Sequence, residues 1–333
     1  MRVVALEEHL SFPTLAGCST RPAPTGEDSM PVVVRNVAAK IVDAGDGRIA
    51  DMDRNGITVQ VLSKAGSHIG ASADQFDGKE AITFAQSFND ELARRIADHP
   101  SRLAAFAHIA AHIPQAAADE LERTVRRYGF KGVLISGTIR GRFLDEPEFA
   151  PLLARAESLD VPIYIHPGMP PAAVRETYYK GFPAKISFGL ATFAWGWHYE
   201  VAVHVMRLAV AGIMDKYPRL NFIIGHMGEG LPAMLHRCEH QFSIDLSYLS
   251  RPLAKTITDQ VYITSSGFFS NPPFVAALQT FGIDRLMFSV DYPYATNEDG
   301  RRFLDNVELA PSDVAKFAHG NADRLLKLTD PRT

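Results

Sequence analysis

The sequence is poor in cysteine, in net charge and in long apolar runs. Its two cysteines, Cys18 and Cys238, are too few for a disulfide framework or a cysteine-rich zinc site, so a reducing compartment fits. The formal net charge of −4 leaves no basic excess to bind phosphates, so no nucleic acid partner is expected. No stretch approaches the roughly 20 apolar residues that span a bilayer, so no membrane association is expected either.

The composition is that of an ordinary globular protein. Hydrophobic residues make up 46% and charged residues 22% of the 333 residues, which excludes a disordered, collagen-like or coiled-coil chain. The apolar N-terminus is followed at once by Glu7 and Glu8, too early for a signal peptide. We therefore expect a cytoplasmic protein.

Short apolar runs recur along the whole chain and alternate with amphipathic segments. The spacing of apolar residues predicts helices over 79–98, 114–128, 148–159 and 199–216. Strands alternating with helices predict a parallel β/α barrel, formed by the single domain of residues 1–333, although the length alone also allows two domains. Eight runs have the pattern of strands covered on both faces: 3–6, 58–62, 103–107, 132–135, 162–165, 222–224, 261–264 and 286–289.

A doubly wound open sheet is the competing fold. It would usually carry a glycine-rich phosphate loop after its first strand, where this chain has Glu-Glu-His.

Two long insertions, at about 11–50 and 167–198, follow predicted strands at the end where barrel enzymes build their active sites. The second insertion is rich in aromatic residues. We interpret it as a pocket wall or an oligomer contact. An aromatic surface segment with only a packing role is an equal alternative.

Metal-ligating residue types follow three of the predicted strands at the same end of the barrel. Glu7 and His9 follow the first strand, His166 the fifth and Asp291 the eighth. Residues two apart in an extended chain project the same way, so Glu7 and His9 can reach one cation together. Each histidine taken alone could make a structural hydrogen bond instead. Together, two carboxylates and two imidazoles favour a site for Zn²⁺, Mn²⁺ or Fe²⁺.

His226 follows the sixth strand, three residues before Glu229. If a helix begins there, the carboxylate reaches the imidazole and prepares it for general acid/base work. Glu229 could instead only place negative charge at a helix N-terminus. Strand alternation turns Glu8 away, toward a structural role, and His68 could approach the pocket from the second loop. The remaining histidines, His198 among them, are assigned no chemical task.

Four stretches of the sequence carry a family resemblance. They are Val-Ala-Leu-Glu-Glu-His at 4–9, Gly-Ile-Met-Asp-Lys-Tyr-Pro at 212–218, Ile-Gly-His-Met-Gly-Glu-Gly-Leu-Pro at 224–232 and Ser-Val-Asp-Tyr-Pro at 289–293. With these motifs the chain resembles the amidohydrolase-related nonoxidative aromatic decarboxylases, which include γ-resorcylate and 2,3-dihydroxybenzoate decarboxylases. The resemblance covers essentially the whole chain.

The resemblance implies a distorted TIM (β/α)8 barrel of the amidohydrolase superfamily. It also implies one divalent metal ion, Zn²⁺ or Mn²⁺ with Mg²⁺ as a further choice, and no organic cofactor. No lysine ends the fourth strand, where two-metal relatives supply a bridging ligand, which favours a single ion. The family positions assign Glu7, His9, His166 and Asp291 to the metal, and His226 and Glu229 to an acid/base pair.

The residues that would bind the substrate are less defined. Arg237 matches a family arginine near the site, although an arginine on a helix surface is the alternative. Met169 and Phe268 lie in the loops after strands five and seven, which choose the substrate. The loop around Met169 is more apolar than in characterised decarboxylases, so the sequence does not identify the aromatic acid.

We therefore predict a carboxy-lyase that removes CO₂ from a hydroxylated aromatic acid during aromatic acid catabolism. Asp291 would donate a proton to the ring carbon, which requires a raised pKa for its carboxyl group, while Glu229 aligns His226. The alternative is a mononuclear metal hydrolase acting on a lactone or amide, because the same ligands can activate water. A hydratase of a ring-cleavage acid and a non-catalytic barrel are further alternatives. The family also implies a homodimer or homotetramer.

Overall fold

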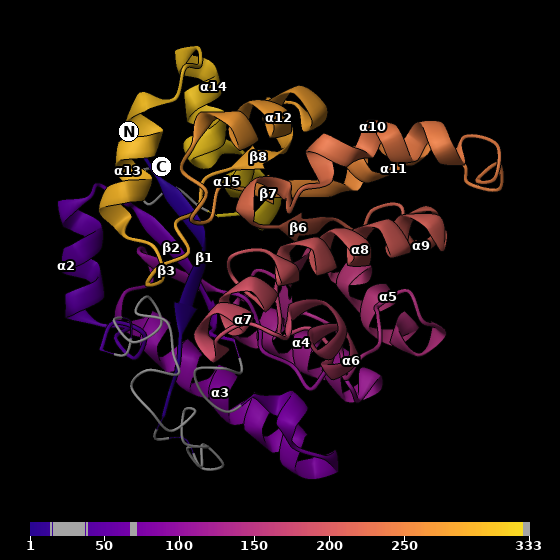
Figure 1. Cartoon of the computed structure of the whole chain (residues 1–333). Coiled ribbons are helices and arrows are strands. Elements are labelled where there is room, and N and C mark those ends of the chain that lie inside the picture. Colours follow the sequence, from indigo (N-terminus) through magenta and orange to yellow (C-terminus); the bar gives the residue numbers. More distant parts are fainter. Residues whose placement is uncertain (14, 16–36, 38, 67–71, 329–333) are drawn as a thin grey trace.

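Short parallel strands form the centre of the protein (Figure 1). The computed structural model describes residues 1–13, 15, 37, 39–66 and 72–328, so His68 and most of the predicted insertion at 11–50 lie outside the described residues. All eight predicted strands are present; the strands at 222–224 and 261–264 have the predicted ends, and the other six are shifted at one or both ends. They are β1 (Val4–Leu10), β2 (Val59–Lys64), β3 (Leu103–Ala105), β4 (Val133–Ser136), β5 (Ile163–His166), β6 (Phe222–Ile224), β7 (Val261–Thr264) and β8 (Leu286–Met287).

The strands pair in two groups, β1–β2–β3 and β4 to β8 in chain order. A parallel bridge between Ala107 and Val133 joins the first group to the second. On the other side, the backbone N–H of His9 donates to the carbonyl oxygen of Tyr292 at 2.7 Å, which connects β1 to the segment after β8. Between β3 and β4, and between β8 and β1, these isolated bonds take the place of a continuous series of strand-to-strand hydrogen bonds. The arrangement is consistent with the predicted distorted barrel.

The inside of the barrel is a packed apolar cluster to which every strand or its continuation contributes. Ala322 and Leu326 of α15 (Asn321–Leu326) also belong to this cluster. Because side chains fill the interior, polar groups are placed at the ends of the strands. The strand-derived members are Val4, Leu6, Val59, Val61, Phe106, Leu134, Tyr164, Ile223, Tyr262 and Met287.

Helices surround the strands (Figure 1). The predicted helix at 114–128 has the predicted ends, because Pro114 occupies its first turn and Gly129 takes a left-handed conformation (φ 69°) that stops it. The predicted helix at 199–216 divides in two at Gly212 (φ 71°). Besides α15, the helices are α2 (Asp46–Arg54), α3 (Gly78–Asp98), α4 (Pro114–Tyr128), α5 (Ala150–Leu159), α6 (Ala172–Val174), α7 (Ala184–Ala191), α8 (Gly196–Val210), α9 (Ile213–Lys216), α10 (Leu231–Phe242), α11 (Leu253–Gln260), α12 (Asn271–Phe281), α13 (Asn297–Asn306) and α14 (Pro311–Ala315).

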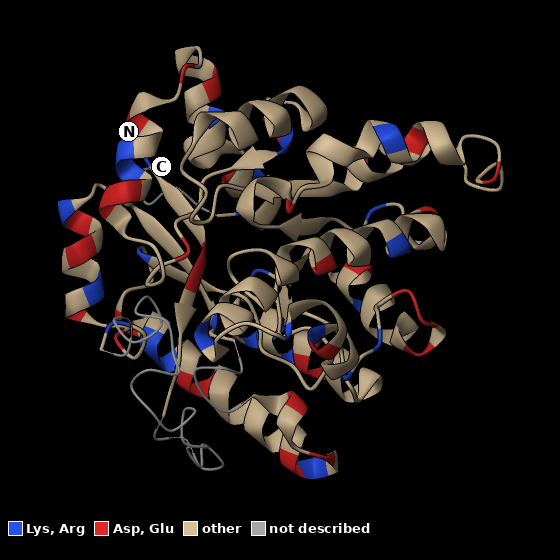
Figure 2. Ribbon diagram, viewed as in Figure 1, with Lys and Arg blue, Asp and Glu red and all other residues tan. Residues whose placement is uncertain are grey.

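The insertion at 167–198 is helical. It forms α6, a π-helical turn (Arg175–Tyr179), α7 and the start of α8. The α10–α11 pair extends away from the strands on the right of Figure 1. Basic and acidic residues alternate along the helices in this view (Figure 2). In the described part of the chain, no helix is long and apolar enough to cross a membrane.

Candidate metal centre and active site

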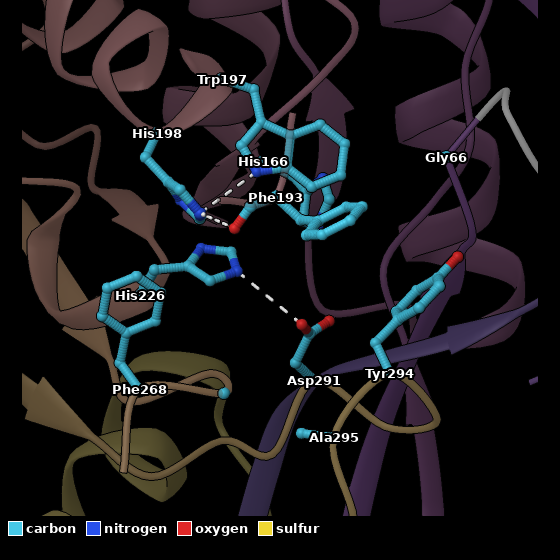
Figure 3. Close-up of a pocket in the computed structure, with 11 residues that line it drawn as sticks. Gly66, His166, Phe193, Trp197, His198, His226, Phe268, Asp291, Tyr294 and Ala295 are labelled. Carbon is cyan, nitrogen blue, oxygen red and sulfur yellow. Dashed lines mark hydrogen bonds and ion pairs between the residues drawn. The ribbon is translucent and has the colours of Figure 1, made fainter. Parts of the chain in front are cut away.

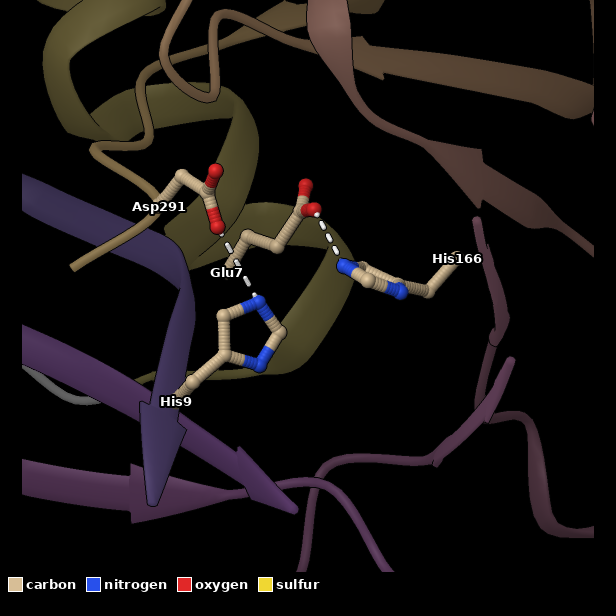
Figure 4. A group of neighbouring side chains, drawn as sticks. All are labelled: Glu7, His9, His166 and Asp291. Carbon is tan, nitrogen blue, oxygen red and sulfur yellow. Dashed lines mark ion pairs between the residues drawn. The ribbon is translucent and has the colours of Figure 1, made fainter. Parts of the chain in front are cut away.

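The four predicted metal ligands converge at the C-terminal ends of the strands (Figure 4). Glu7 and His9 lie within β1, His166 ends β5 and Asp291 lies in the loop after β8. One ligand atom of each residue lies within 4.8 Å of the others. Nε2 of His166 is 3.0 Å from Oε1 of Glu7, and Nε2 of His9 is 3.1 Å from Oδ1 of Asp291.

A bulge in β1 lets Glu7 face this site. The register with β2 shifts between Ala5 and Glu8, and Leu6 packs inside the barrel. In a regular strand Glu7 would point away from the side of Leu6, whereas a bulge re-aims the following side chains. The predicted strand ended before Glu7, whereas the observed strand continues to Leu10 because the bulge does not end the pairing.

Both imidazoles of the cluster are held by their Nδ1 atoms. Nδ1 of His166 lies 2.6 Å from the carbonyl oxygen of Pro167, and Nδ1 of His9 lies 3.2 Å from Oγ of Ser63. Such contacts leave Nε2 of each ring directed at the cluster, the usual arrangement for metal-binding histidines.

Oε1 of Glu7 and Nε2 of His9 are buried, and among the described residues their closest polar contacts are the approaches to other members of this cluster. Buried polar atoms without partners destabilise a fold, and a divalent cation between these atoms would satisfy them. Two imidazole nitrogens and two carboxylate oxygens form a donor set for Zn²⁺ or Mn²⁺. The residues therefore fit the predicted ion.

Hydroxyl groups support the second oxygen of Glu7. Tyr164 and Ser266 donate hydrogen bonds to its Oε2 atom, and Oγ1 of Thr264 lies 3.5 Å from it. Burial alone would raise the pKa of Glu7, but the imidazoles of His226 and His166 lower the pKa below its usual range. Glu7 is therefore held as a carboxylate, the form that binds a cation.

Glu8 has the structural role that strand alternation predicted. Its carboxyl oxygens accept hydrogen bonds from the backbone N–H groups of Val290 and Tyr292, both at 3.0 Å. Burial raises the pKa of Glu8 to about 7 against the effect of these bonds. The side chain thus ties β1 to the segment that carries Asp291.

The environment of Asp291 differs from the sequence-based expectation. Burial would raise the pKa of Asp291, but hydrogen bonding to His226 and His9 outweighs burial and lowers it. The raised pKa required by our sequence-based mechanism is therefore not found. The group begins as a carboxylate, and a mechanism must supply its proton.

His226 and Glu229 meet, but through a turn and not through a helix. Nδ1 of His226 lies 2.7 Å from Oε1 of Glu229. Both residues adopt left-handed conformations (φ 49° and 56°), and α10 begins only at Leu231, so the contact does not depend on the helix start that the sequence analysis made its condition. Burial would lower the pKa of His226, but the carboxylates of Glu229 and Glu7 raise it well above its usual value.

A cavity of about 190 Å³ adjoins the metal cluster (Figure 3). Phe193 and Trp197 come from the aromatic insertion and Phe268 from the loop after β7, so this part of the insertion does form a pocket wall. His166, His226 and Asp291 also line the cavity. The lining residues are Gly66, His166, Phe193, Trp197, His198, His226, Gly267, Phe268, Asp291, Tyr294 and Ala295.

The structure places the other tentative substrate residues outside this cavity. Met169 lines an adjoining cavity of about 140 Å³, which shares Gly66 with the first. Arg237 is exposed on α10 and does not line a described cavity. His198, which the sequence patterns did not single out, lines the cavity and contacts Glu229. The two residues lie on different elements, and no local spacing signals such a contact.

The chain is similar to proteins of known family and activity. The sequence profile of the amidohydrolase family matches residues 9–328. Decarboxylase orsB of Emericella nidulans is 37% identical over 308 residues, covering 89% of each chain, and γ-resorcylate decarboxylase of Rhizobium sp. is 34% identical, covering 98% of each. The crystal structure of dihydroxybenzoic acid decarboxylase from Polaromonas sp. JS666, with bound manganese and the inhibitor 2-nitroresorcinol, has a TM-score of 0.85 and 30% identity, and the match covers 98% of this chain and 97% of that one.

Proposed function

Because this chain belongs to the amidohydrolase family, we propose that it is a metal-dependent decarboxylase of an aromatic acid with a hydroxyl group beside its carboxylate. The predicted resemblance to the aromatic decarboxylases is confirmed by the relatives. One observation carries the proposal for this chain. Asp291 belongs both to the metal-ligand cluster and to the wall of the aromatic-lined cavity, so one carboxylate reaches the ion and a bound ring.

The cavity suits a single aromatic ring. Phe193, Trp197 and Phe268 offer apolar and aromatic surface, while His226 and Asp291 supply the polar groups. Small-molecule sites commonly combine an apolar wall with a few polar groups that fix orientation. Phe268 therefore remains our proposed contact with the substrate.

The protonation states of Asp291 and of the substrate hydroxyl define the proposed reaction steps. A divalent cation held by Glu7, His9, His166 and Asp291 supplies a Lewis acid for the carboxylate and the adjacent hydroxyl of the substrate. Asp291 begins as a carboxylate and takes the proton of that hydroxyl. It then donates the proton to the ring carbon bearing the carboxylate, and aromaticity is lost. The carbon–carbon bond breaks, its electron pair restores the ring, CO₂ leaves, and the phenolate product takes a proton from solvent.

His226 faces the same space. Its Nε2 atom lies 3.8 Å from Oδ2 of Asp291 and 3.7 Å from Oε1 of Glu7. Because Glu229 binds Nδ1 of the ring, Nε2 remains available to hydrogen-bond an oxygen of the substrate. We assign His226 to holding the substrate in plane, with Glu229 fixing the orientation of the ring.

The test is a substrate panel with metal-loaded protein. We expect CO₂ and the matching phenol from 2,6-dihydroxybenzoate or another ortho-hydroxybenzoate, and no turnover of 4-hydroxybenzoate, which lacks the neighbouring hydroxyl. The reverse reaction should place labelled bicarbonate into the phenol. Lactone or amide hydrolysis without CO₂ release from any acid would support the hydrolase alternative instead.

We also propose that the protein is a cytoplasmic homo-oligomer. The low cysteine content suits a reducing compartment. Large apolar side chains are exposed along α8 and α10 and just before α8, including Trp195, Val203 and Met234, and exposed apolar groups of this kind are common at subunit contacts. Sedimentation equilibrium tests this proposal, and a monomer at micromolar concentration would contradict it.

A further inference from the structure

Glu229 binds two histidines at once. Oε1 of Glu229 accepts from Nδ1 of His226 at 2.7 Å, and Oε2 accepts from Nδ1 of His198 at 2.6 Å. All three residues are buried. The carboxylate is therefore held from two elements, the turn after β6 and the first turn of α8.

The turn that carries His226 and Glu229 combines a disfavoured backbone conformation with two internal hydrogen bonds. The N–H of Gly228 donates to the carbonyl oxygen of Gly225 at 2.8 Å, and the N–H of Glu229 donates to the carbonyl oxygen of His226 at 3.3 Å. His226, Met227 and Glu229 all have positive φ, near 50°, a conformation that side chains other than glycine disfavour. Such backbone persists when surrounding contacts fix it. The contact from His198 comes from outside the turn and reaches the residue that orients His226.

His198 is itself fixed at its other nitrogen. Nε2 of its ring lies 3.0 Å from the carbonyl oxygen of Phe193 and 3.3 Å from Nε1 of Trp197 (Figure 3). The ring also packs edge-on against His226 and Phe268, with centroids 4.6 and 5.2 Å away. Rotation of this imidazole would break hydrogen bonds at both nitrogens, so it is a rigid donor to Glu229.

We propose that His198 is a positioning residue that acts through Glu229 to aim Nε2 of His226 at the substrate, a role that rests on the proposed function. The aromatic insertion thereby has a role in catalysis as well as in forming the pocket wall. The start of α8 supplies pocket wall through Trp197 and also fixes the geometry of the group facing the reacting ring.

A double-mutant cycle on metal-loaded enzyme tests the role in turnover. His198→Phe keeps a ring but removes the donor, and we expect kcat to fall by about 10- to 100-fold, the usual cost of losing such an orienting partner, with a much smaller change in KM. His198→Asn places an amide N–H near the position of Nδ1 and should recover most of kcat. In Glu229→Gln the phenylalanine substitution should cost little more, because its effect passes through Glu229.

Two outcomes of this cycle would overturn the proposal. One is an equal loss of kcat in His198→Phe and His198→Asn, which would assign the residue to packing. The other is additivity, meaning that the double variant loses the product of the two single losses. Metal content and thermal unfolding of each variant show whether the comparison is between folded, loaded enzymes.

A measurement without substrate separates this proposal from the proposed function. In ¹⁵N-histidine-labelled, metal-loaded protein, the Nδ1–H protons of His198 and His226 should give two downfield signals. His198→Phe should remove one and shift the other, while the exposed His240→Ala control leaves both. An unshifted His226 signal in His198→Phe overturns the positioning role. A shifted signal in a protein that decarboxylates no acid supports the role and rejects the activity.

Discussion

The Nε2 atom of His166 lies 3.0 Å from the Oε1 atom of Glu7, and no other hydrogen-bond partner of that oxygen is found among the described residues. The two side chains come from β5 and β1, which are not neighbours in the barrel. Their convergence, with His9 and Asp291 completing the set, makes this end of the barrel a candidate cation site.

Removing one ligand should remove the ion. We expect purified His166→Ala to contain less than about a tenth of the wild-type metal per chain, because outer supports alone change affinity about 10- to 100-fold and a ligand contributes more. Mass-spectrometric metal analysis checks this. His240→Ala, an exposed histidine on α10, should keep full occupancy. Equal metal content in both variants would exclude His166 as a ligand.

Asp291→Asn should separate metal binding from turnover. The amide can still offer an oxygen to the ion but cannot carry the proton to the ring carbon, so we expect kcat to fall about 10²- to 10⁴-fold, the usual contribution of a positioned acid/base. The measurement is CO₂ release at saturating metal, with occupancy determined on the same sample. Near-wild-type turnover would remove Asp291 as the proton donor.

Gly225→Ala should disturb the metal site by displacing the side chain of Glu7. A Cβ atom at Gly225 would lie 2.4 Å from Oε2 of Glu7, whereas the backbone itself (φ −85°) tolerates any side chain. We expect weaker metal binding, seen as a higher dissociation constant in a competition assay with a chelator. Gly45→Ala is the matched control, since its Cβ would meet Asp43 at an ordinary 3.7 Å. Unchanged affinity in Gly225→Ala would show that Glu7 can move freely.

His204 should make the fold sensitive to acid. Burial lowers the pKa of His204 to about 4, and its Nε2 atom accepts a hydrogen bond from the backbone N–H of Leu144 at 3.0 Å. Between about pH 6.5 and pH 4 the unfolded chain binds a proton that the folded chain excludes, so stability falls as the pH drops through this window. The full effect is on the order of 3 kcal/mol.

Urea unfolding at pH 7, 5.5 and 4.5 measures this dependence. His204→Gln keeps an acceptor near the position of Nε2 but does not titrate, so its free energy of unfolding should fall less steeply with acid. When the free energies of unfolding of the two proteins are subtracted at each pH, the contribution of the metal ligands cancels. Parallel curves for both proteins would contradict the assignment.

Local patterns in the sequence predicted most of the elements. The helix at 114–128 was located by its apolar spacing, its initial proline and the glycine after it, all of which act within a few residues. The four candidate ligands could be grouped from the sequence because barrel strands end at one rim, so residues that follow different strands meet there. The contact of His226 with Glu229 was expected on the condition that a helix began there, and the left-handed turn that makes it instead has no clear mark in the residue types.

The sequence by itself determined the alternation of strands and helices, the family, and the residue types that bind a divalent ion. Only the tertiary structure decided which atoms meet: the bulge that turns Glu7 inward, the low pKa of Asp291, and the contact of His198 with Glu229. The physical reason is the distance along the chain over which each interaction acts. Apolar period and capping act over a few residues, whereas burial, proton affinity and hydrogen bonds between elements depend on distances that exist only once the barrel has closed.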